Sequence, residues 1–214
     1  MNKLFNEETG AQVTEILSKM VDPITIRLFV PEKIDEPSEV TKQLFEELKE
    51  FNEKINLEVL VLEENLELAA QYDYDKAPSF VILDDQLNDV RVRFKGVPLG
   101  HEINSLLTAM LEISHASNHL PKEVEDRIKN LNKPANIKVF VTTACPHCPG
   151  AVQKAHQLAQ LNDNIVGEMI EVQTFNELAM KYNVSSVPKI VINETNEFVG
   201  NQPIEEFIRV LESL

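Results

Sequence analysis

The chain has 214 residues, 43% of them hydrophobic, which is enough apolar material for one large domain or for two of about 100 residues. Its 20 Lys and Arg residues against 35 Asp and Glu give a formal net charge of -15, which argues against binding to nucleic acid or to an anionic membrane surface. The first residues form no apolar signal core, and no later apolar run approaches the length of a membrane span. We therefore expect a soluble, cytoplasmic protein.

Hydrophobic spacing in the first half predicts a leading helix followed by the element order βαβαββα. Val13, Ile16 and Leu17 recur at helical spacing, and the Asp22-Pro23 pair ends that helix. Alternating and β-branched runs predict the strands. The expected helices cover residues 7–20, 37–51, 64–70 and 100–114, and the expected strands cover residues 24–30, 57–62, 79–83 and 90–94.

The second half repeats the first at a nearly constant offset. Residues 25–30 match residues 136–141, and Ala77-Pro78 corresponds to Val187-Pro188, 110 positions later. A further leading helix is expected over residues 121–131. Near-constant spacing over several landmarks predicts two tandem copies of one unit, at residues 1–116 and 117–214.

The only two cysteines, Cys145 and Cys148, follow the predicted strand at 137–141. Residues 142–144 are expected to form a turn, and Pro146 suits the first turn of a helix, where its missing N–H costs nothing. Cys145 then lies at the helix N-terminus, where the unpaired N–H groups and the macrodipole stabilise a thiolate and lower the thiol pKa.

Cys148 is expected one turn further along the same helical face, close enough to Cys145 for a disulfide and more deeply shielded. His147 lies between them and, when protonated, would stabilise the Cys145 thiolate and make the disulfide more oxidising. A Cys-x-x-Cys in a strand, turn and helix context is typical of a redox-active dithiol.

Two other interpretations of the cysteine pair fit less well. A purely structural disulfide closing so short a loop removes little chain entropy. A zinc site generally needs four ligands, and the other candidates nearby are His147 and His156. His156 would lie roughly 16 Å along the helix from Cys145, too far to share a metal, so no metal is expected.

The first copy has no thiol at the equivalent site. The offset places Ile34 opposite Cys145 and Pro37 opposite Cys148. Residues 32–37 are therefore interpreted as a former active-site loop that serves packing or partner contact, with packing favoured. Chemistry is expected in the second copy alone.

A βαβαββα unit with Cys-x-x-Cys at its first strand-helix junction and Val187-Pro188 before its third strand resembles the thioredoxin and glutaredoxin fold. Two such units, with residues 139–149 and 187–192 as the most specific motifs, are similar to the glutaredoxin-like protein disulfide oxidoreductases of thermophilic archaea and bacteria. The chain differs from many of these in lacking an N-terminal Cys-x-x-Cys. It also resembles the N-terminal module of the flavoprotein that reduces alkyl hydroperoxide peroxiredoxins.

The resemblance implies an α/β fold of two tandem thioredoxin-like units, each a central mixed β-sheet flanked by helices. It implies that Cys145 is the attacking thiolate and Cys148 the resolving thiol. It further implies that Pro188 is a cis proline facing the dithiol, and that the Val187 backbone pairs with a substrate segment as an added strand.

The leading functional hypothesis is a thiol-disulfide oxidoreductase that acts on protein disulfides. The glycines form no G-x-G-x-x-G motif, so we expect no bound dinucleotide, flavin or other cofactor. The resemblance implies a thioredoxin-reductase-like flavoprotein as electron donor, with glutathione as the other candidate. The alternatives are a dedicated relay between one flavoprotein and one peroxiredoxin, and a non-catalytic protein-binding module.

Overall fold

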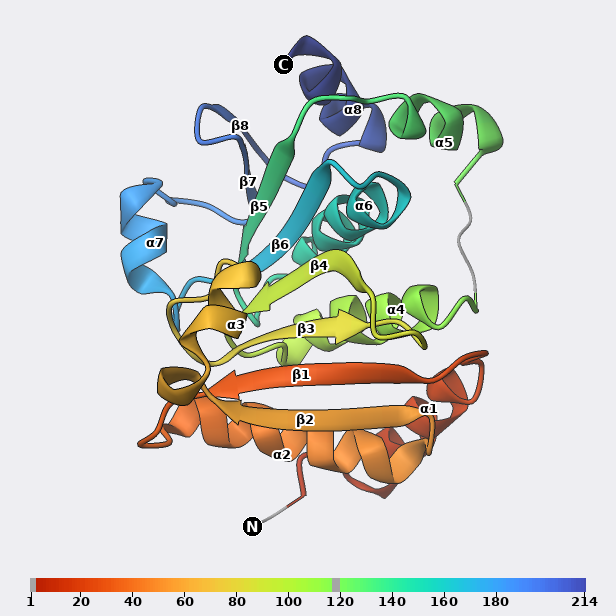
Figure 1. The fold of residues 1–214 in the computed structure, drawn as a ribbon, viewed down its shortest axis with the longest axis vertical. Helices are drawn as coiled ribbons and strands as arrows, with labels where there is room; N and C mark the ends of the chain where they lie inside the picture. Colours follow the sequence, from red (N-terminus) through yellow and green to blue (C-terminus); the bar gives the residue numbers. More distant parts are fainter. Residues whose placement is uncertain (1–2, 117–119) are drawn as a thin grey trace.

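A mixed sheet of eight strands runs through the part of the chain that the computed structural model describes, residues 3–116 and 120–214 (Figure 1). The strand order is β2-β1-β3-β4-β6-β5-β7-β8. The strands are β1 (Ile24–Val30), β2 (Ile55–Val61), β3 (Ser79–Leu83), β4 (Asp89–Lys95), β5 (Ala135–Val141), β6 (Ile165–Glu171), β7 (Lys189–Ile192) and β8 (Asn196–Val199).

The same pairing pattern occurs at both ends of the sheet. β1 pairs with β2 in parallel and with β3 antiparallel, and β5 pairs in the same way with β6 and β7. β4 and β6 pair in parallel and join the two ends. The predicted α/β class with a mixed sheet is therefore confirmed. The predicted boundary between residues 116 and 117 adjoins residues 117–119, which lie outside the described residues, and it stays a prediction.

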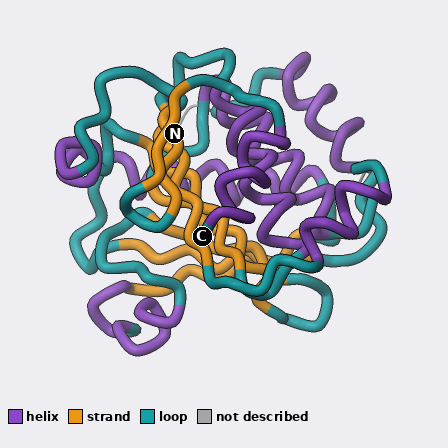
Figure 2. Tube along the Cα trace, turned by 90° about the horizontal axis from the view of Figure 1, so that it is seen from above, coloured by secondary structure: helices purple, strands orange, loops and turns teal. Residues whose placement is uncertain are grey.

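Helices cover both faces of the sheet, and the longer ones gather on one of them (Figure 2). Along β1, Ile26 and Leu28 face the core beneath the long helices, whereas Phe29 packs with the cluster beneath a short one. The helices are α1 (Glu7–Leu17), α2 (Glu36–Phe51), α3 (Leu66–Gln71), α4 (Ile103–Ile113), α5 (Lys122–Lys129), α6 (Cys148–Leu161), α7 (Asn176–Lys181) and α8 (Ile204–Ser213).

The predicted elements of the first half are all present, with ends that shift by a few residues. The strands predicted at 24–30 and 79–83 have the predicted bounds. The helix expected over 100–114 begins as a short 3-10 turn, Gly100–Glu102, before α4. Helix ends differ most because capping contacts, which periodicity does not report, decide where a helix begins.

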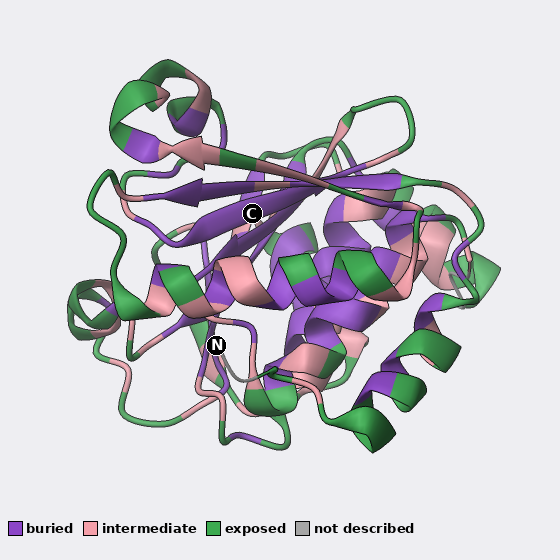
Figure 3. Ribbon diagram, turned by 90° about the horizontal axis from the view of Figure 1, so that it is seen from below, coloured by how far each residue is buried: buried purple, intermediate pink, exposed green. Residues whose placement is uncertain are grey.

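The hydrophobic core continues across the β4–β6 junction. Phe80 and Phe94 stack with ring centroids 4.5 Å apart, and Phe94 contacts the His156 ring of α6 at 4.8 Å. Gly167 lets α6 lie directly on β6, because a Cβ there would be 2.4 Å from the Ala155 carbonyl oxygen. Figure 3 shows that the inner strands and the helix faces toward them are buried, whereas the edge strands β2 and β8 are mostly half-buried or exposed.

His156 is a neutral histidine inside this core. It is 1% exposed, and no side-chain hydrogen bond reaches either ring nitrogen among the described residues. Burial lowers its pKa to about 3, against a weaker opposing effect of the nearby Arg93 backbone. The unfolded chain therefore binds a proton that the folded protein excludes, and the free energy of unfolding falls as the pH drops below about 6.5.

We expect His156→Leu to remove this loss of stability in acid. At pH 4.5 the wild-type histidine should cost about 3 kcal/mol of unfolding free energy relative to pH 7.5, and the leucine variant should lack that component. Urea unfolding at the two pH values measures it. His101→Gln, which changes an exposed histidine, is the matched control. If the unfolding free energy fell equally between pH 7.5 and pH 4.5 in the wild type and in the His156 variant, the buried histidine would not be the cause of the acid destabilisation.

Candidate functional site

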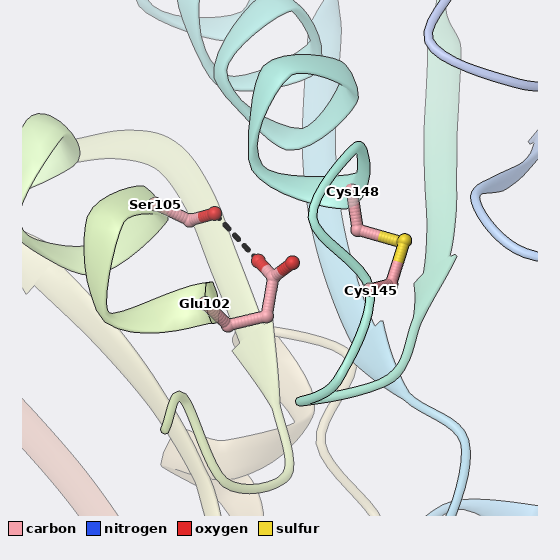
Figure 4. The surroundings of a disulfide bond; sticks show 4 residues. All are labelled: Glu102, Ser105, Cys145 and Cys148. Carbon is pink, nitrogen blue, oxygen red and sulfur yellow. Dashed lines mark hydrogen bonds between the residues drawn. A yellow bond between two sulfur atoms is a disulfide. The ribbon is translucent and has the colours of Figure 1, made fainter. Parts of the chain in front are cut away.

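The two cysteines form a disulfide where β5 gives way to α6 (Figure 4). Their Cα atoms are 5.5 Å apart. Cys145 is 8% exposed, whereas Cys148 is fully buried. Both cysteines are buried, and Cys148 is the more deeply shielded of the two, as the sequence predicts.

The helix begins later than the sequence predicts. α6 starts at Cys148, with His147 as its N-cap and Pro149 in its first turn. Cys145 lies in the preceding turn, where its N–H donates to the Thr142 carbonyl oxygen at 3.2 Å. The placement of Pro146 in the first helical turn, and of both cysteines on one helical face, was therefore wrong. Either proline suits a first turn on local grounds, and Pro149 occupies it here.

The N-terminus of α6 still lies beside both cysteines, although the helix starts three residues later than Cys145. Cys148 is the first residue of α6, and the disulfide holds the Cys145 sulfur against the Cys148 sulfur. Both sulfurs thus adjoin a helix N-terminus, where unpaired N–H groups favour an anion. The lowered pKa of the Cys145 thiol stays a prediction. Pro146 and His147 are exposed beside the disulfide, and their tuning roles also stay predictions.

Sequence reasoning missed an acidic residue at this site. Glu102 is fully buried, and Figure 4 shows its carboxylate directed toward the disulfide. Ser105 donates a hydrogen bond to one carboxylate oxygen at 2.5 Å, and the other oxygen has no partner among the described residues. Burial raises the pKa of Glu102 to about 7, although the Ser105 hydrogen bond opposes the shift.

The spacing of Glu102 could have identified it. Glu102 precedes Leu106 by four residues and Ala109 by seven, so it shares the buried face of an apolar helix. A carboxyl group on such a face is costly unless it has a role or a partner.

The segment that carries Glu102 is attached to the cysteine loop. Gly100 has a φ of +60°, and a Cβ there would lie 2.2 Å from the Thr143 carbonyl oxygen, so only glycine permits this approach. The His101 N–H donates to the same oxygen at 2.8 Å. The first half of the chain thus supplies an ionisable group to a disulfide in the second half.

The Val187–Pro188 bond is cis, as the resemblance implied, and so is the Ala77–Pro78 bond. Phe140 near the end of β5 pairs with Lys189, so Pro188 lies at the edge of the sheet where the cysteine loop begins. Val187 is half-buried, the strand ladders begin at Lys189, and the Val187 backbone makes no turn or loop hydrogen bond among the described residues. A backbone in this position is open to an added strand.

The equivalent loop of the first half differs from the predicted packing element. Residues 32–36 are exposed, and Pro37 alone of residues 32–37 is half-buried. Ile34, opposite Cys145 in the repeat, is 46% exposed. The favoured packing role is therefore wrong for most of this loop.

No helix in the described ranges is long and apolar enough to cross a membrane.

Comparisons with known proteins agree with this geometry. Residues 135–213 match the family model described as a thioredoxin domain. The chain is 29% identical over 179 residues to AhpF of Staphylococcus aureus, a component of alkyl hydroperoxide reductase, and the match covers 84% of this chain and 32% of that relative. The chain therefore spans about a third of the length of the curated relatives it matches.

Two solved structures superpose over nearly the whole chain. AhpF of Enterococcus faecalis gives a TM-score of 0.90 at 29% identity, covering 97% of this chain and 99% of that chain. A protein disulfide oxidoreductase from Aeropyrum pernix gives 0.88 at 27% identity, covering 97% and 92%. The chain thus contains a thioredoxin-fold domain, and its Cys145–Cys148 disulfide has the Cys-x-x-Cys spacing of a redox couple.

Proposed function

We propose that the protein exchanges electron pairs with disulfides of other proteins through Cys145 and Cys148. The observation that carries this proposal is the unequal burial of the two cysteines in one disulfide on a thioredoxin fold. A less buried first thiol and a fully shielded second thiol suit thiol-disulfide exchange.

The reaction proceeds in two exchange steps when the protein is reduced. The Cys145 thiolate attacks one sulfur of the substrate disulfide, and the other substrate sulfur leaves as a thiolate. The Cys148 thiolate then attacks the Cys145 sulfur of the mixed disulfide, which closes the Cys145–Cys148 disulfide and releases the second substrate thiolate. One disulfide is reduced, and the protein dithiol loses two electrons.

Glu102 is the candidate proton acceptor for the second step. Cys148 is buried and must lose its thiol proton to attack, and burial opposes ionisation of a thiol. A carboxyl with a pKa of about 7, directed toward the disulfide, can accept that proton near neutral pH. In the reverse direction the same group returns the proton.

The remaining site residues receive supporting roles in this proposal. The Val187 backbone and Pro188 bind the substrate segment beside the disulfide, and His147 and Pro146 tune the Cys145 thiol. The thiol-free residues 1–116 and the catalytic residues 117–214 form two tandem thioredoxin-like units. The chain is then a disulfide oxidoreductase variant without an N-terminal Cys-x-x-Cys.

A second candidate is a dedicated electron relay between a flavoprotein reductase and a peroxiredoxin in the cytoplasm. The similarity to AhpF of alkyl hydroperoxide reductase, a relative of which the match covers 32%, favours it. Saturable transfer to one peroxiredoxin, with little reduction of unrelated disulfides, would distinguish the relay from a general oxidoreductase. A non-catalytic binding module is the remaining alternative.

We expect the reduced protein to reduce insulin disulfides under dithiothreitol, measured as precipitation of the free insulin B chain. The matched control is the same protein with both thiols alkylated by iodoacetamide. A wild-type rate no higher than that of the alkylated protein, together with no transfer to a peroxiredoxin, would contradict the proposed function.

A further inference from the structure

A groove of about 410 Å³ lies beside the cysteine loop, between the two halves of the chain. α2 contributes Pro37 and Val40, the segment after β4 contributes Val97 and Leu99, and the cysteine loop contributes Thr143. All five residues are half-buried. Its volume falls in the range of roughly 300–1,000 Å³ typical of ligand sites.

Two segments of the chain connect the groove lining to the redox site. Thr143 lines the groove and is two residues before Cys145. Val97 and Leu99 line it on the same segment that directs Glu102 toward the disulfide. An extended polypeptide advances about 3.3 Å per residue, so residues a few positions from a reacting cysteine reach such a neighbouring groove.

The charge on the α2 side of the groove is negative, whereas the Lys76 ammonium donates to the carbonyl oxygen of the lining residue Thr174 at 2.9 Å. Glu36, at the first turn of α2, is the one ionisable residue in its lining within the described residues, and it is exposed. Around it, residues 32–39 carry Glu32, Asp35 and Glu39 as further exposed carboxylates, with Lys33 as the one cation. This groove therefore suits an apolar side chain next to a basic one.

We propose that this groove binds the polypeptide segment flanking the reacting cysteine of a protein disulfide substrate, and that it selects an apolar residue beside Lys or Arg. This inference rests on the proposed function and gives the thiol-free half a role in substrate binding. The exposed Ile34, opposite Cys145 in the repeat, adds apolar surface at the same end of α2.

The test uses two peptides of equal length, each with one cysteine in a mixed disulfide with thionitrobenzoate. One peptide carries Leu and Arg within four residues of the cysteine, and the other carries Ser and Glu. Pre-reduced protein reacts once: each dithiol reduces one mixed disulfide and releases the peptide thiol and the coloured thionitrobenzoate. The small disulfide 5,5'-dithiobis(2-nitrobenzoate), which has no flanking segment, reports the chemistry alone.

We expect the Leu-Arg peptide to react about tenfold faster than the Ser-Glu peptide. Val40→Asp and Val97→Asp should each remove about tenfold of the Leu-Arg rate while changing the small-disulfide rate less than about twofold. Glu36→Lys, an exposed substitution that does not threaten folding, should invert the charge preference. Leu87→Asp, in the β3–β4 turn at the opposite end of the sheet, is the matched control.

Equal rates for the two peptides, in the wild type and in the Glu36→Lys variant, would overturn the docking proposal and leave the disulfide chemistry intact. A dimer that becomes monomeric on Val40→Asp, seen by sedimentation, would also overturn it, because a second copy would then occupy the groove. Failure of every disulfide to react would instead contradict the proposed function.

Discussion

Replacing Cys145 with serine is expected to lower disulfide exchange by at least about a thousandfold. A serine hydroxyl does not ionise near neutral pH and forms no disulfide, so the first exchange step disappears. Single-turnover reduction of 5,5'-dithiobis(2-nitrobenzoate) by the pre-reduced variant measures the loss. The one thiol that remains in this variant, Cys148, is fully buried, so it does not replace the missing one.

Cys148→Ser is the matched variant for this experiment. It keeps the less buried Cys145 thiol and loses the fully buried resolving thiol, so the first step should proceed and the mixed disulfide should accumulate. Mass spectrometry detects that adduct. If the Cys145→Ser variant kept wild-type activity, the thiol mechanism would be contradicted. The non-catalytic binding module would then be the remaining hypothesis. An adduct on Cys148 in the Cys145→Ser variant, with none on Cys145 in the Cys148→Ser variant, would reverse the assigned roles.

Glu102→Gln is expected to slow closure of the Cys145–Cys148 disulfide by about a hundredfold and to remove its dependence on a group with a pKa of about 7. Glutamine keeps the shape of the side chain and the contact with Ser105, but it accepts no proton. The measurement is the rate of thiolate release from the mixed disulfide between pH 5.5 and 8.5. Glu15→Gln, an exposed change on α1, is the control.

The same substitution should stabilise the protein at alkaline pH. Burial raises the Glu102 pKa from its usual 4.5 to about 7, so the folded protein holds a proton that the unfolded chain has released. The free energy of unfolding therefore falls as the pH rises from 4.5 through 7, by about 3 kcal/mol in total. Glu102→Gln should recover this loss at pH 8 and change little at pH 4.

These two effects have opposite signs, which separates a functional role from a structural one. A carboxyl group that only supports the fold would lower stability and activity together when replaced. A variant that is more stable at pH 8 yet closes its disulfide slowly fits a group retained for proton transfer. An unchanged pH profile of closure would remove Glu102 from the mechanism.

Much of the site could be predicted because its signals are local. Two cysteines three positions apart after a β-branched strand identify Cys145 and Cys148 without tertiary information. The start of α6 could not be predicted as well. Pro146 and Pro149 both suit a first helical turn, and the hydrogen bonds formed around the cysteines place Pro149 there.

The surroundings of Glu102 and the groove could not be predicted from the sequence, because both depend on contacts between distant segments. Glu102 lies 43 positions before Cys145, and periodicity places it on a buried face without saying which residues it meets there. Pro37 and Val97 approach Thr143 only because β4 and β6 pair and bring the two halves into one sheet. Contacts of this kind depend on how distant segments pack together.

The sequence by itself determined the redox pair, the order of helices and strands, and the absence of a thiol in the first half, because each follows from residue type and spacing along the chain. Only the tertiary structure decided that a buried carboxyl faces the disulfide and that an apolar groove with carboxylates beside it lies next to the cysteine loop. Both features join residues from the two halves, and their burial and pKa shifts exist only once the halves are packed together.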